Sequence, residues 1–278
     1  MPIDFNQQVI EEFRATKGQV GGPFAGGRLL LLTTTGARSG RPHTTPLAYL
    51  PDGLERTLVV ASAGGSPRHP DWFRNVLANP EVTVEFGLFT VKARAAVLEG
   101  EERDRLFARA AEADPAWADY EAKSGRTLPV VALYQIMAGP PAAGSFGATL
   151  KLVHQIFRRE LALIRQDVAR SGPALGAQLR VNCLTVCQGL HHHHVGEDTM
   201  LFPRIGERHP HLAPVLERLN REHEAIAALM EELKAVLSAG DADPARLAHQ
   251  VERLTTELET HLDYEEEHLV PLLDAPAP

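Results

Sequence analysis

The stretch HHHHVGEDTMLFP, residues 191–203, decides how the second half of this 278-residue chain folds. It contains the pattern His-x3-Glu-x5-Pro, and the stretch HLDYEEEHLVP, residues 261–271, contains the same pattern. Residues four apart lie on one face of an α-helix, so the histidine and glutamate of each copy can reach the same point. The repeat therefore predicts two helices that form equivalent sides of one site.

Apolar residues at spacings of three and four run through the second half, which predicts helices with one buried face. Breaks at residues 171–173, 202–214 and 238–244 leave four such helices, so we predict an all-α, up-down four-helix bundle. Ionisable side chains fall in step with the apolar stripes or border them. They are His154, His193, Glu197, His223, His261 and Glu265.

A buried charge or imidazole is costly without a partner, and a metal centre is a partner that all six groups can share. Nitrogen and oxygen ligands without thiolate favour two iron ions over manganese or zinc. Two alternatives stay open. His194 with Asp198 has the same four-residue spacing, and Cys183 and Cys187 could join His191 and His194 in a zinc-type stripe, although paired helical cysteines are more often buried apolar groups.

Residues 147–272 resemble the hemerythrin-like (HHE cation-binding) family. The resemblance rests on the two repeated motifs, on REHEAI around His223 and on KLVHQIFRREL around His154. It implies a di-iron centre that binds dioxygen, nitric oxide or peroxide, with the six residues above as ligands. Many members carry a fifth histidine one turn from that of the third helix, where this chain has Leu219 and Ala227. Either another histidine of the 191–194 run replaces it, or one iron has an open position.

The first half is predicted to alternate short strands and helices, which indicates a small antiparallel barrel or an α+β domain. Asp52-Gly53 and Gly87 are expected hairpin turns. The expected strands lie within residues 28–35, 43–65, 81–98 and 127–136. Helices are expected at residues 5–17, with Asp4 as N-cap, and at 71–79 and 101–113. The Gly/Pro-rich residues 137–147 predict a boundary, giving domains 1–140 and 147–274.

The segment TTTGARSGRPHTTPLAYLPDG, residues 33–53, carries glycines beside arginines, which suits an anion, although a solvated turn would look similar. Together with VVASAGGSPRHPDWFRNVLANPEVTVEF, residues 59–86, it resembles the deazaflavin-dependent nitroreductase family over residues 5–137. The resemblance implies a split β-barrel of the FMN-binding-like type. It also implies reduction by coenzyme F-420, an 8-hydroxy-5-deazaflavin that carries hydride, with FMN less favoured.

The resemblance assigns residues to the coenzyme in three groups. Arg38, Ser39, Gly40 and Arg41 would meet its phosphate or acidic tail; Ser62, Gly64 and Gly65 would line the ring; Trp72 and Asn75 would shape the pocket. Ser62 and Tyr120 would act in catalysis. Departures from the family pattern are Ala63 and His43, where lysine and arginine are common, and Ala48, Asp114 and Trp117, where substrate-site tyrosines are known. Quinones and other electrophiles are therefore as open as nitro compounds.

The net charge of −8 does not favour nucleic acid as a partner. The longest apolar run, residues 29–32, is far short of the roughly 18 residues of a membrane span. Two cysteines exclude a disulfide scaffold, so we expect a cytoplasmic protein, with peripheral membrane association left open. The favoured hypothesis is a two-module oxidoreductase, with a homodimer through the barrel as a further expectation. The alternatives are a non-catalytic oxygen or iron sensor and a metal-storage protein.

Overall fold

The computed structural model describes residues 5–136, 144–171, 175–239 and 243–275. Asp4, most of the predicted boundary at 137–147 and parts of the breaks at 171–173 and 238–244 lie outside these residues. The chain divides into two compact units, one made by the first half together with Gly176–Val181 and one by the rest of the second half. The domain limits 1–140 and 147–274 stay predictions.

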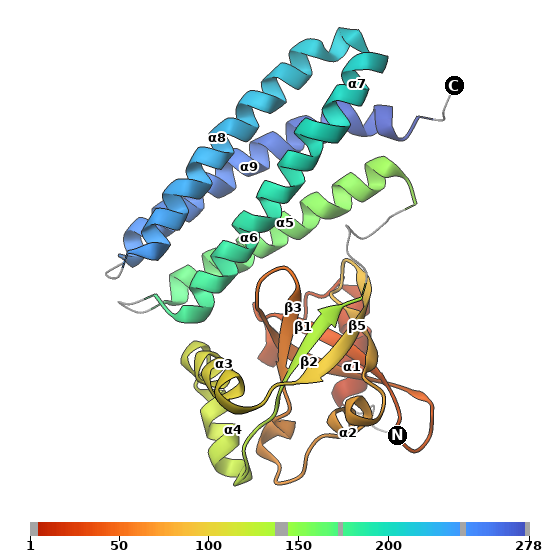
Figure 1. Ribbon diagram of the computed structural model, residues 1–278, viewed down its shortest axis with the longest axis vertical. Coiled ribbons are helices and arrows are strands. Elements are labelled where there is room, and N and C mark those ends of the chain that lie inside the picture. Colours follow the sequence, from red (N-terminus) through yellow and green to blue (C-terminus); the bar gives the residue numbers. More distant parts are fainter. Residues whose placement is uncertain (1–4, 137–143, 172–174, 240–242, 276–278) are drawn as a thin grey trace. The chain divides into compact units, whose positions relative to one another are not determined.

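The first unit is a closed barrel of antiparallel strands, which confirms the predicted fold class (Figure 1). Its strand order is β1-β2-β3-β6-β5-β4. Asp52-Gly53 connects β2 to β3 and Gly87 connects β4 to β5, as the turn chemistry predicts. The strands are β1 (Leu29–Thr35), β2 (Pro42–Pro51), β3 (Arg56–Val60), β4 (Glu81–Glu85), β5 (Thr90–Val97) and β6 (Val130–Gln135).

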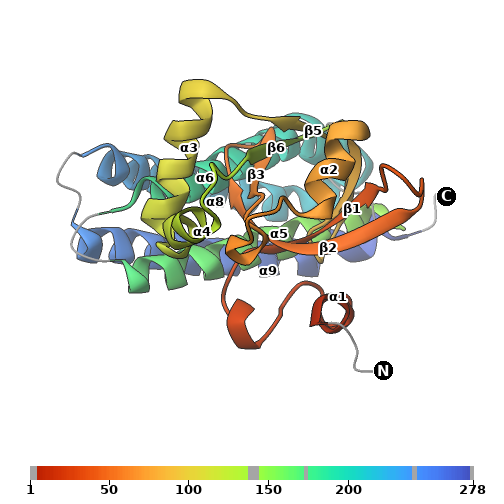
Figure 2. The ribbon, with the colours of Figure 1, turned by 90° about the horizontal axis from the view of Figure 1, so that it is seen from below.

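Helices cover the barrel from several sides. In two perpendicular views α3 and α4 lie together on one side of the barrel, away from α2 (Figure 1, Figure 2). Trp72 and Phe73 of α2 are buried in a core cluster with Leu30, Val59 and Val131 of the strands. The helices are α1 (Phe5–Ala15), α2 (Asp71–Ala78), α3 (Gly100–Ala113) and α4 (Ala116–Ser124), and the short turns are η1 (Gly22–Phe24) and η2 (Ala63–Gly65).

The second unit is all helical, and α9 packs against both α5 and α8. The up-down connectivity of a four-helix bundle stays a prediction. Ser145 caps the start of α5 through the Ala148 N–H, and Asp243 caps α9 through the Ala245 N–H. The helices are α5 (Phe146–Arg170), α6 (Ala177–Gly196), α7 (Phe202–Arg208), α8 (Ala213–Ser238) and α9 (Pro244–Leu273), with the short turns η3 (Glu197–Leu201) and η4 (Pro210–Leu212).

The predicted break at residues 202–214 is wrong in its first half. The chain stays helical from α6 through η3, which is a π-helical turn, and on through α7 to Arg208. Pro203 does not end the helix; it lies where the π-helical turn gives way to α7 and the hydrogen-bond pattern changes. In the described ranges of the chain, no helix is both long and apolar enough to cross a lipid bilayer.

Candidate functional site

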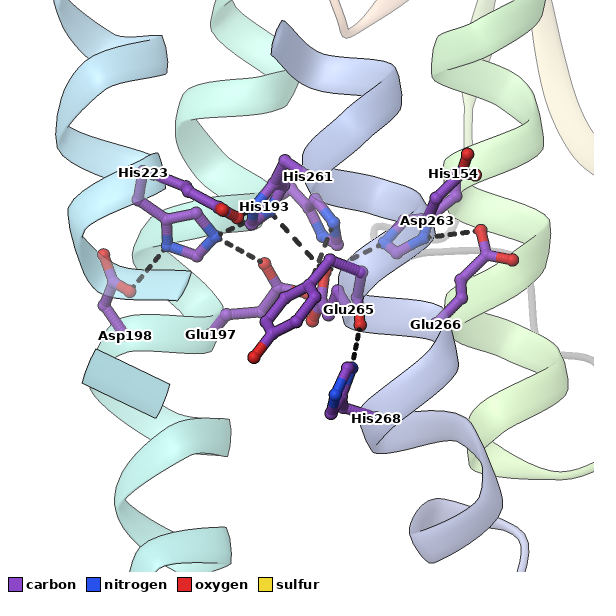
Figure 3. Close-up of polar contacts among 12 residues, drawn as sticks. His154, His193, Glu197, Asp198, His223, His261, Asp263, Glu265, Glu266 and His268 are labelled. Atoms are coloured by element: carbon purple, nitrogen blue, oxygen red, sulfur yellow. Dashed lines mark hydrogen bonds and ion pairs between the residues drawn. The ribbon is translucent and has the colours of Figure 1, made fainter. Parts of the chain in front are cut away.

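Five imidazoles and two carboxylates meet in the interior of the helical unit, and Figure 3 shows six of these seven side chains. Each long helix contributes, because the ionisable residues continue the spacing of the buried leucines. His193 keeps 12% of its side chain exposed, and the other six residues are at most 4% exposed. The seven residues are His154, His193, His194, Glu197, His223, His261 and Glu265.

The seven side chains form two groups. Within each group, the ligand atoms all lie within 4.8 Å of one another. His194, His223 and His261 make the first group, which we call the trio. His154, His193, Glu197 and Glu265 make the second group, which we call the quartet. Each group gathers residues from three helical segments or more, so neither is an accident of one helix face.

Each carboxylate of the quartet lies between a histidine of its own group and a histidine of the trio. Glu197 Oε1 is 3.3 Å from His193 Nε2 in the quartet, and its Oε2 is 3.6 Å from His223 Nε2 in the trio. Glu265 Oε2 is 3.4 Å from His154 Nε2 in the quartet and 3.8 Å from His261 Nε2 in the trio. The two glutamates therefore occupy the positions from which a carboxylate can bridge two metal ions.

Three of the histidines are held from outside by carboxylates. His154 Nδ1 lies 2.9 Å from Glu266 Oε1, His223 Nδ1 lies 2.7 Å from Asp198 Oδ1, and His261 Nδ1 lies 3.0 Å from Glu222 Oε2. Because an ionised carboxylate only accepts hydrogen bonds, each Nδ1 donates, and the lone pair of the neutral ring falls on Nε2. All three Nε2 atoms point into the site.

Arginines extend two of these contacts outward. Arg158 Nη1 lies 2.7 Å from Glu266 Oε1. Arg218 Nε lies 2.7 Å from Glu222 Oε1, and its guanidinium stacks 3.6 Å above the ring of Tyr264. Each of these carboxylates is thus held from two sides, by an arginine and by a histidine. The hydrogen bonds with His154 and Arg158 outweigh burial and lower the pKa of Glu266 to about 2.

Burial and neighbouring imidazoles keep much of the site uncharged in the metal-free protein. Burial, with repulsion from His154, lowers the pKa of His193 to about 3. Burial, with repulsion from His223, also lowers the pKa of His194. Burial and the nearby charge of Glu265 raise the pKa of Glu197. Neutral imidazole is the form that binds metal, and a cation between the glutamates would remove their mutual repulsion.

The hydrogen bonding of the buried side chains shows that these residues fit a metal centre. Among the described residues, His154, His193 and His194 have no hydrogen-bond partner for Nε2, and Glu197 and Glu265 have none for either carboxylate oxygen, although all these atoms are buried. Buried polar atoms are nearly always satisfied, and each unsatisfied one is expensive. Seven such atoms converging on one region make a site that could hold a cation.

His194 joins the site although the spacing argument selected His193. It stacks on His223 with ring centroids 4.1 Å apart and contacts His261 edge-on at 5.3 Å. Residues three apart also share a helix face, so the spacing of His194 to Glu197 carried the signal. His191 and His192 are exposed, and Cys183 and Cys187 are buried, outside both groups. Sequence spacing gave no sign that Glu222 of α8 meets His261 of α9.

The barrel unit builds its own candidate site from two loops and α2. The turn after β1 closes through Gly36 and Gly40, where a Cβ on Gly36 would lie 2.3 Å from Ser39 Oγ and Gly40 has φ +62°. Asn75 fixes this turn, because its Oδ1 accepts from the Ala37 N–H at 2.9 Å. Its Nδ2 donates to Thr34 Oγ1 at 3.0 Å. Asn75 is 7% exposed, and its contact with the coenzyme stays a prediction. Its hydrogen bonds to Ala37 and Thr34 hold the turn directly.

The second loop, residues 61–69, is held by Arg126, which the sequence pattern did not reveal. Its guanidinium donates to the backbone carbonyls of Ala61, Ser62, Ser66 and Arg68 at 3.0–3.4 Å. Burial lowers the pKa of Arg126.

Other predicted coenzyme residues fall around these loops. Helix α4 packs against η2, so Tyr120 comes from the element that neighbours Ser62 and Gly64. Arg38, Ser39 and Arg41 are exposed on the first turn. Trp72 is 4% exposed in the barrel core and leaves little surface for a ligand. The roles of all these residues stay predictions.

Together the fold and the side chains define a class of protein: a closed antiparallel barrel joined to a helical unit with a candidate cation site. Residues 6–135 match the family model of the F420H(2)-dependent quinone reductase, and residues 146–273 match that of the Hemerythrin HHE cation binding domain. An F420H(2)-dependent quinone reductase of Mycobacterium tuberculosis is 38% identical over 125 residues, which are 44% of this chain and 83% of that protein. The chain belongs to the F420H(2)-dependent quinone reductase family and carries a hemerythrin HHE domain.

Two solved structures are also similar. One is the structure of an F420-H2 dependent reductase, which is 41% identical and covers 38% of this chain and 93% of its own, with a TM-score of 0.35. The other is described as a domain-swapped dimer, which is 36% identical and covers 48% of this chain and 99% of its own, with a TM-score of 0.37.

Proposed function

We propose that the barrel unit uses reduced deazaflavin coenzyme to reduce a quinone, a nitro compound or a similar electrophile. In the same chain, the helical unit would hold two iron ions that bind or react with dioxygen, peroxide or nitric oxide. Membership of the reductase family supports the first part. The observation that carries the second part is the position of Glu197 and Glu265, each between one histidine of the trio and one of the quartet.

The proposed ligands divide between two ions. His194, His223 and His261 would hold one ion, and His154 and His193 would hold the other. Glu197 and Glu265 would bridge them. This set contains all six residues chosen from the sequence and adds His194. His194 would take the place of the fifth histidine, which is absent from both positions one turn from His223, Leu219 and Ala227. A ligand set made only of imidazoles and carboxylates favours iron among the metals that bind in helical bundles of this kind.

When bound, the iron pair would supply reversible one-electron chemistry and a coordination position for a small ligand. The chain's own residues would supply neutral lone pairs at Nε2, fixed by the carboxylates on Nδ1, and a buried environment that limits water. Imidazoles held this way are oriented before any metal arrives, which lowers the cost of assembling the site.

A metal analysis with optical spectra tests the iron proposal. Protein purified without oxygen should contain about two irons per chain, the number that two ligand groups provide. Its spectrum should change on exposure to air. One iron per chain, or a spectrum that air and nitric oxide leave unchanged, would contradict a reactive pair of ions. A ratio well above two would support storage instead.

In the barrel unit, we assign the anionic part of the coenzyme to Arg38, Ser39, Gly40 and Arg41, and its ring to Ser62, Gly64 and Gly65. The hydride would pass from the coenzyme to the electrophile, with Ser62 and Tyr120 beside the acceptor. The contact between α4 and η2 supports this arrangement because it brings the two residues' elements together. A homodimer through the barrel stays a prediction that sedimentation can test.

Coenzyme oxidation with menadione and with a nitroaromatic acceptor tests the reductase proposal. We expect turnover with at least one acceptor, and Tyr120→Phe should lower that turnover while leaving coenzyme binding unchanged. Tight coenzyme binding without turnover would favour a sensor over an enzyme. Equal activity of Tyr120→Phe and the unaltered chain would remove Tyr120 from the catalytic residues.

A further inference from the structure

A pocket of about 500 Å³ opens on the helical unit beside the trio. It lies between the end of α6 with η3 on one side and α8 on the other, and all its lining residues belong to these segments. Two members of the trio, His194 and His223, form part of its wall. The pocket therefore lies between the solvent and two residues of the trio.

The outer lining of the pocket carries groups that bind cations. Asp198 and Glu224 supply two carboxylates, and His191 supplies an exposed imidazole. Asp198 also reaches inward, since its Oδ1 lies 2.7 Å from Nδ1 of His223. At the inner end, His194 is only 4% exposed, and its Nε2 has no hydrogen-bond partner among the described residues. Donor groups thus follow one another from the surface to an unsatisfied ligand atom.

One of the residues on the α8 side of the pocket is small. Ala227 lies one helical turn after His223 and lines the pocket together with Met230. Six water molecules occupy about 180 Å³ at about 30 Å³ each, so a hydrated divalent cation fits in the volume present. A larger side chain at position 227 would fill the space next to the trio.

We infer that this pocket is the route by which a divalent metal cation reaches the buried trio and leaves it. The inference rests on the proposed metal centre. The negative charge of the two carboxylates attracts a cation and repels an anion. A neutral gas molecule would be neither attracted nor repelled by these charges. A hydrated cation would exchange its water for carboxylate and imidazole ligands along the route.

Cobalt(II) is a suitable probe because its visible spectrum reports nitrogen and oxygen coordination and it does not require oxygen-free handling. Metal-free full-length protein would be mixed rapidly with Co²⁺, and the metal would later be withdrawn with excess EDTA. Ala227→Leu fills part of the pocket and replaces none of the proposed ligands. Ala228→Leu is the matched control, because Ala228 is exposed on the same helix and does not line the pocket.

Blocking a route slows both directions equally and leaves the equilibrium unchanged. We expect Ala227→Leu to slow Co²⁺ uptake and EDTA extraction by a common factor of about ten, with the same final metal content. Glu224→Gln, which retains the side-chain shape, should slow uptake about threefold at low ionic strength and hardly at all in high salt. Glu217→Gln, on an exposed residue outside the pocket, should change neither rate.

Several outcomes would overturn the inference. Rates in Ala227→Leu and Glu224→Gln equal to those of their controls would show that the cation travels elsewhere. A slower uptake with lost metal at equilibrium would show damage to the ligands instead of a blocked route. Slower azide binding to the iron-loaded protein, with unchanged Co²⁺ kinetics, would make the pocket a path for ligands. Absence of any Co²⁺ uptake by the unaltered chain would overturn the metal centre itself.

Discussion

The Nε2 atoms of His223 and His261 face each other 3.1 Å apart, from two different helices. Both rings donate from Nδ1 to a carboxylate, so both Nε2 atoms carry lone pairs when the rings are neutral. Two nitrogen ligands at about 2.1 Å from one metal ion and at right angles lie about 3.0 Å apart. The separation of these two atoms is therefore the one expected of neighbouring ligands on a single cation.

His193 and His194 are predicted to serve different ions. His193→Ala should remove a ligand of the quartet and His194→Ala a ligand of the trio, so each should lower iron content to about one ion per chain or less. His192→Ala is the control, because His192 is exposed in the same run. Iron analysis of the three variants checks this. Full iron content in His194→Ala would show that His194 is not a metal ligand.

Glu222 is predicted to position His261 through Nδ1. Glu222→Gln keeps the size of the side chain but weakens the acceptor, and outer-ligand changes of this kind typically cost about 10- to 100-fold in metal affinity. Competition with a metal-binding dye measures the loss, and Glu217→Gln is the surface control. Unaltered affinity together with an unaltered optical spectrum would show that His261 does not need this contact.

The metal-free protein is predicted to lose stability as the solution is acidified. His193 has a pKa of about 3 in the fold and about 6.5 when unfolded. The unfolded chain therefore binds the proton first, and the free energy of unfolding falls as the pH drops below about 6.5. His194, with its pKa lowered, acts in the same direction. His154 opposes them: although burial lowers it, hydrogen bonds to Glu265 and Glu266 raise its pKa overall.

Urea unfolding of metal-free protein at pH 7 and pH 5 measures this effect. We expect a loss on the order of 1–2 kcal/mol for each histidine held neutral, partly offset by His154 and by Glu197, whose raised pKa lets the folded chain bind a proton that the unfolded chain does not. His193→Gln should show a smaller loss between the two pH values than the unaltered chain. Equal losses in both proteins would mean that His193 is not the group that binds the proton.

Asn75 is predicted to hold the coenzyme-facing turn through Ala37. Asn75→Ala leaves the Ala37 N–H and Thr34 hydroxyl without this partner and should cost about 1–3 kcal/mol of stability. It should also weaken coenzyme binding, because the turn loses its fixed shape. Asn79→Ala is the control, since the Asn79 amide makes a longer contact of 3.4 Å with Thr35 O. Fluorescence titration of the coenzyme compares the two variants.

Arg126 is predicted to position the Ser62 loop. Arg126→Lys keeps the charge but cannot donate to four carbonyls, so the loop should loosen and the KM for reduced coenzyme should rise more than kcat falls. Arg105→Lys, on an exposed residue of α3, serves as the control. A fall in kcat at constant KM would place Arg126 in the chemical step instead.

Much of the fold could be read from spacing and turn chemistry. The leucines before His261, at positions 247, 254 and 258, are each 0% exposed, as a buried helix face requires. The hairpins at Asp52-Gly53 and Gly87 were marked by residues that accept positive φ, which Gly53 and Gly87 adopt at 78° and 88°. Periodicity and turn residues are local properties, so a single sequence reveals them.

Contacts between helices could not be read in this way. The pairs Glu222–His261 and His154–Glu266 join different helices, 39 and 112 residues apart. Helical spacing predicts which face a residue occupies and leaves its height along the neighbouring helix undetermined. The same limit applies to Arg126, whose acceptors lie about sixty residues earlier in the chain. The repeated spacing selected His193 and did not reveal that His194 also enters the site, although His194 lies within one turn of Glu197.

The π-helical turn at Glu197–Leu201 has a consequence for the evolution and engineering of this chain. Such a turn is an α-helix with one residue inserted, and one residue turns an α-helix by about 100°. The extra residue therefore sets the phase with which Phe202 and Ile205, 3% and 4% exposed, reach the core. Deleting one residue here would restore a regular helix and swing both side chains toward solvent. A single-residue deletion within this turn should therefore be costly, even though it leaves a regular helix.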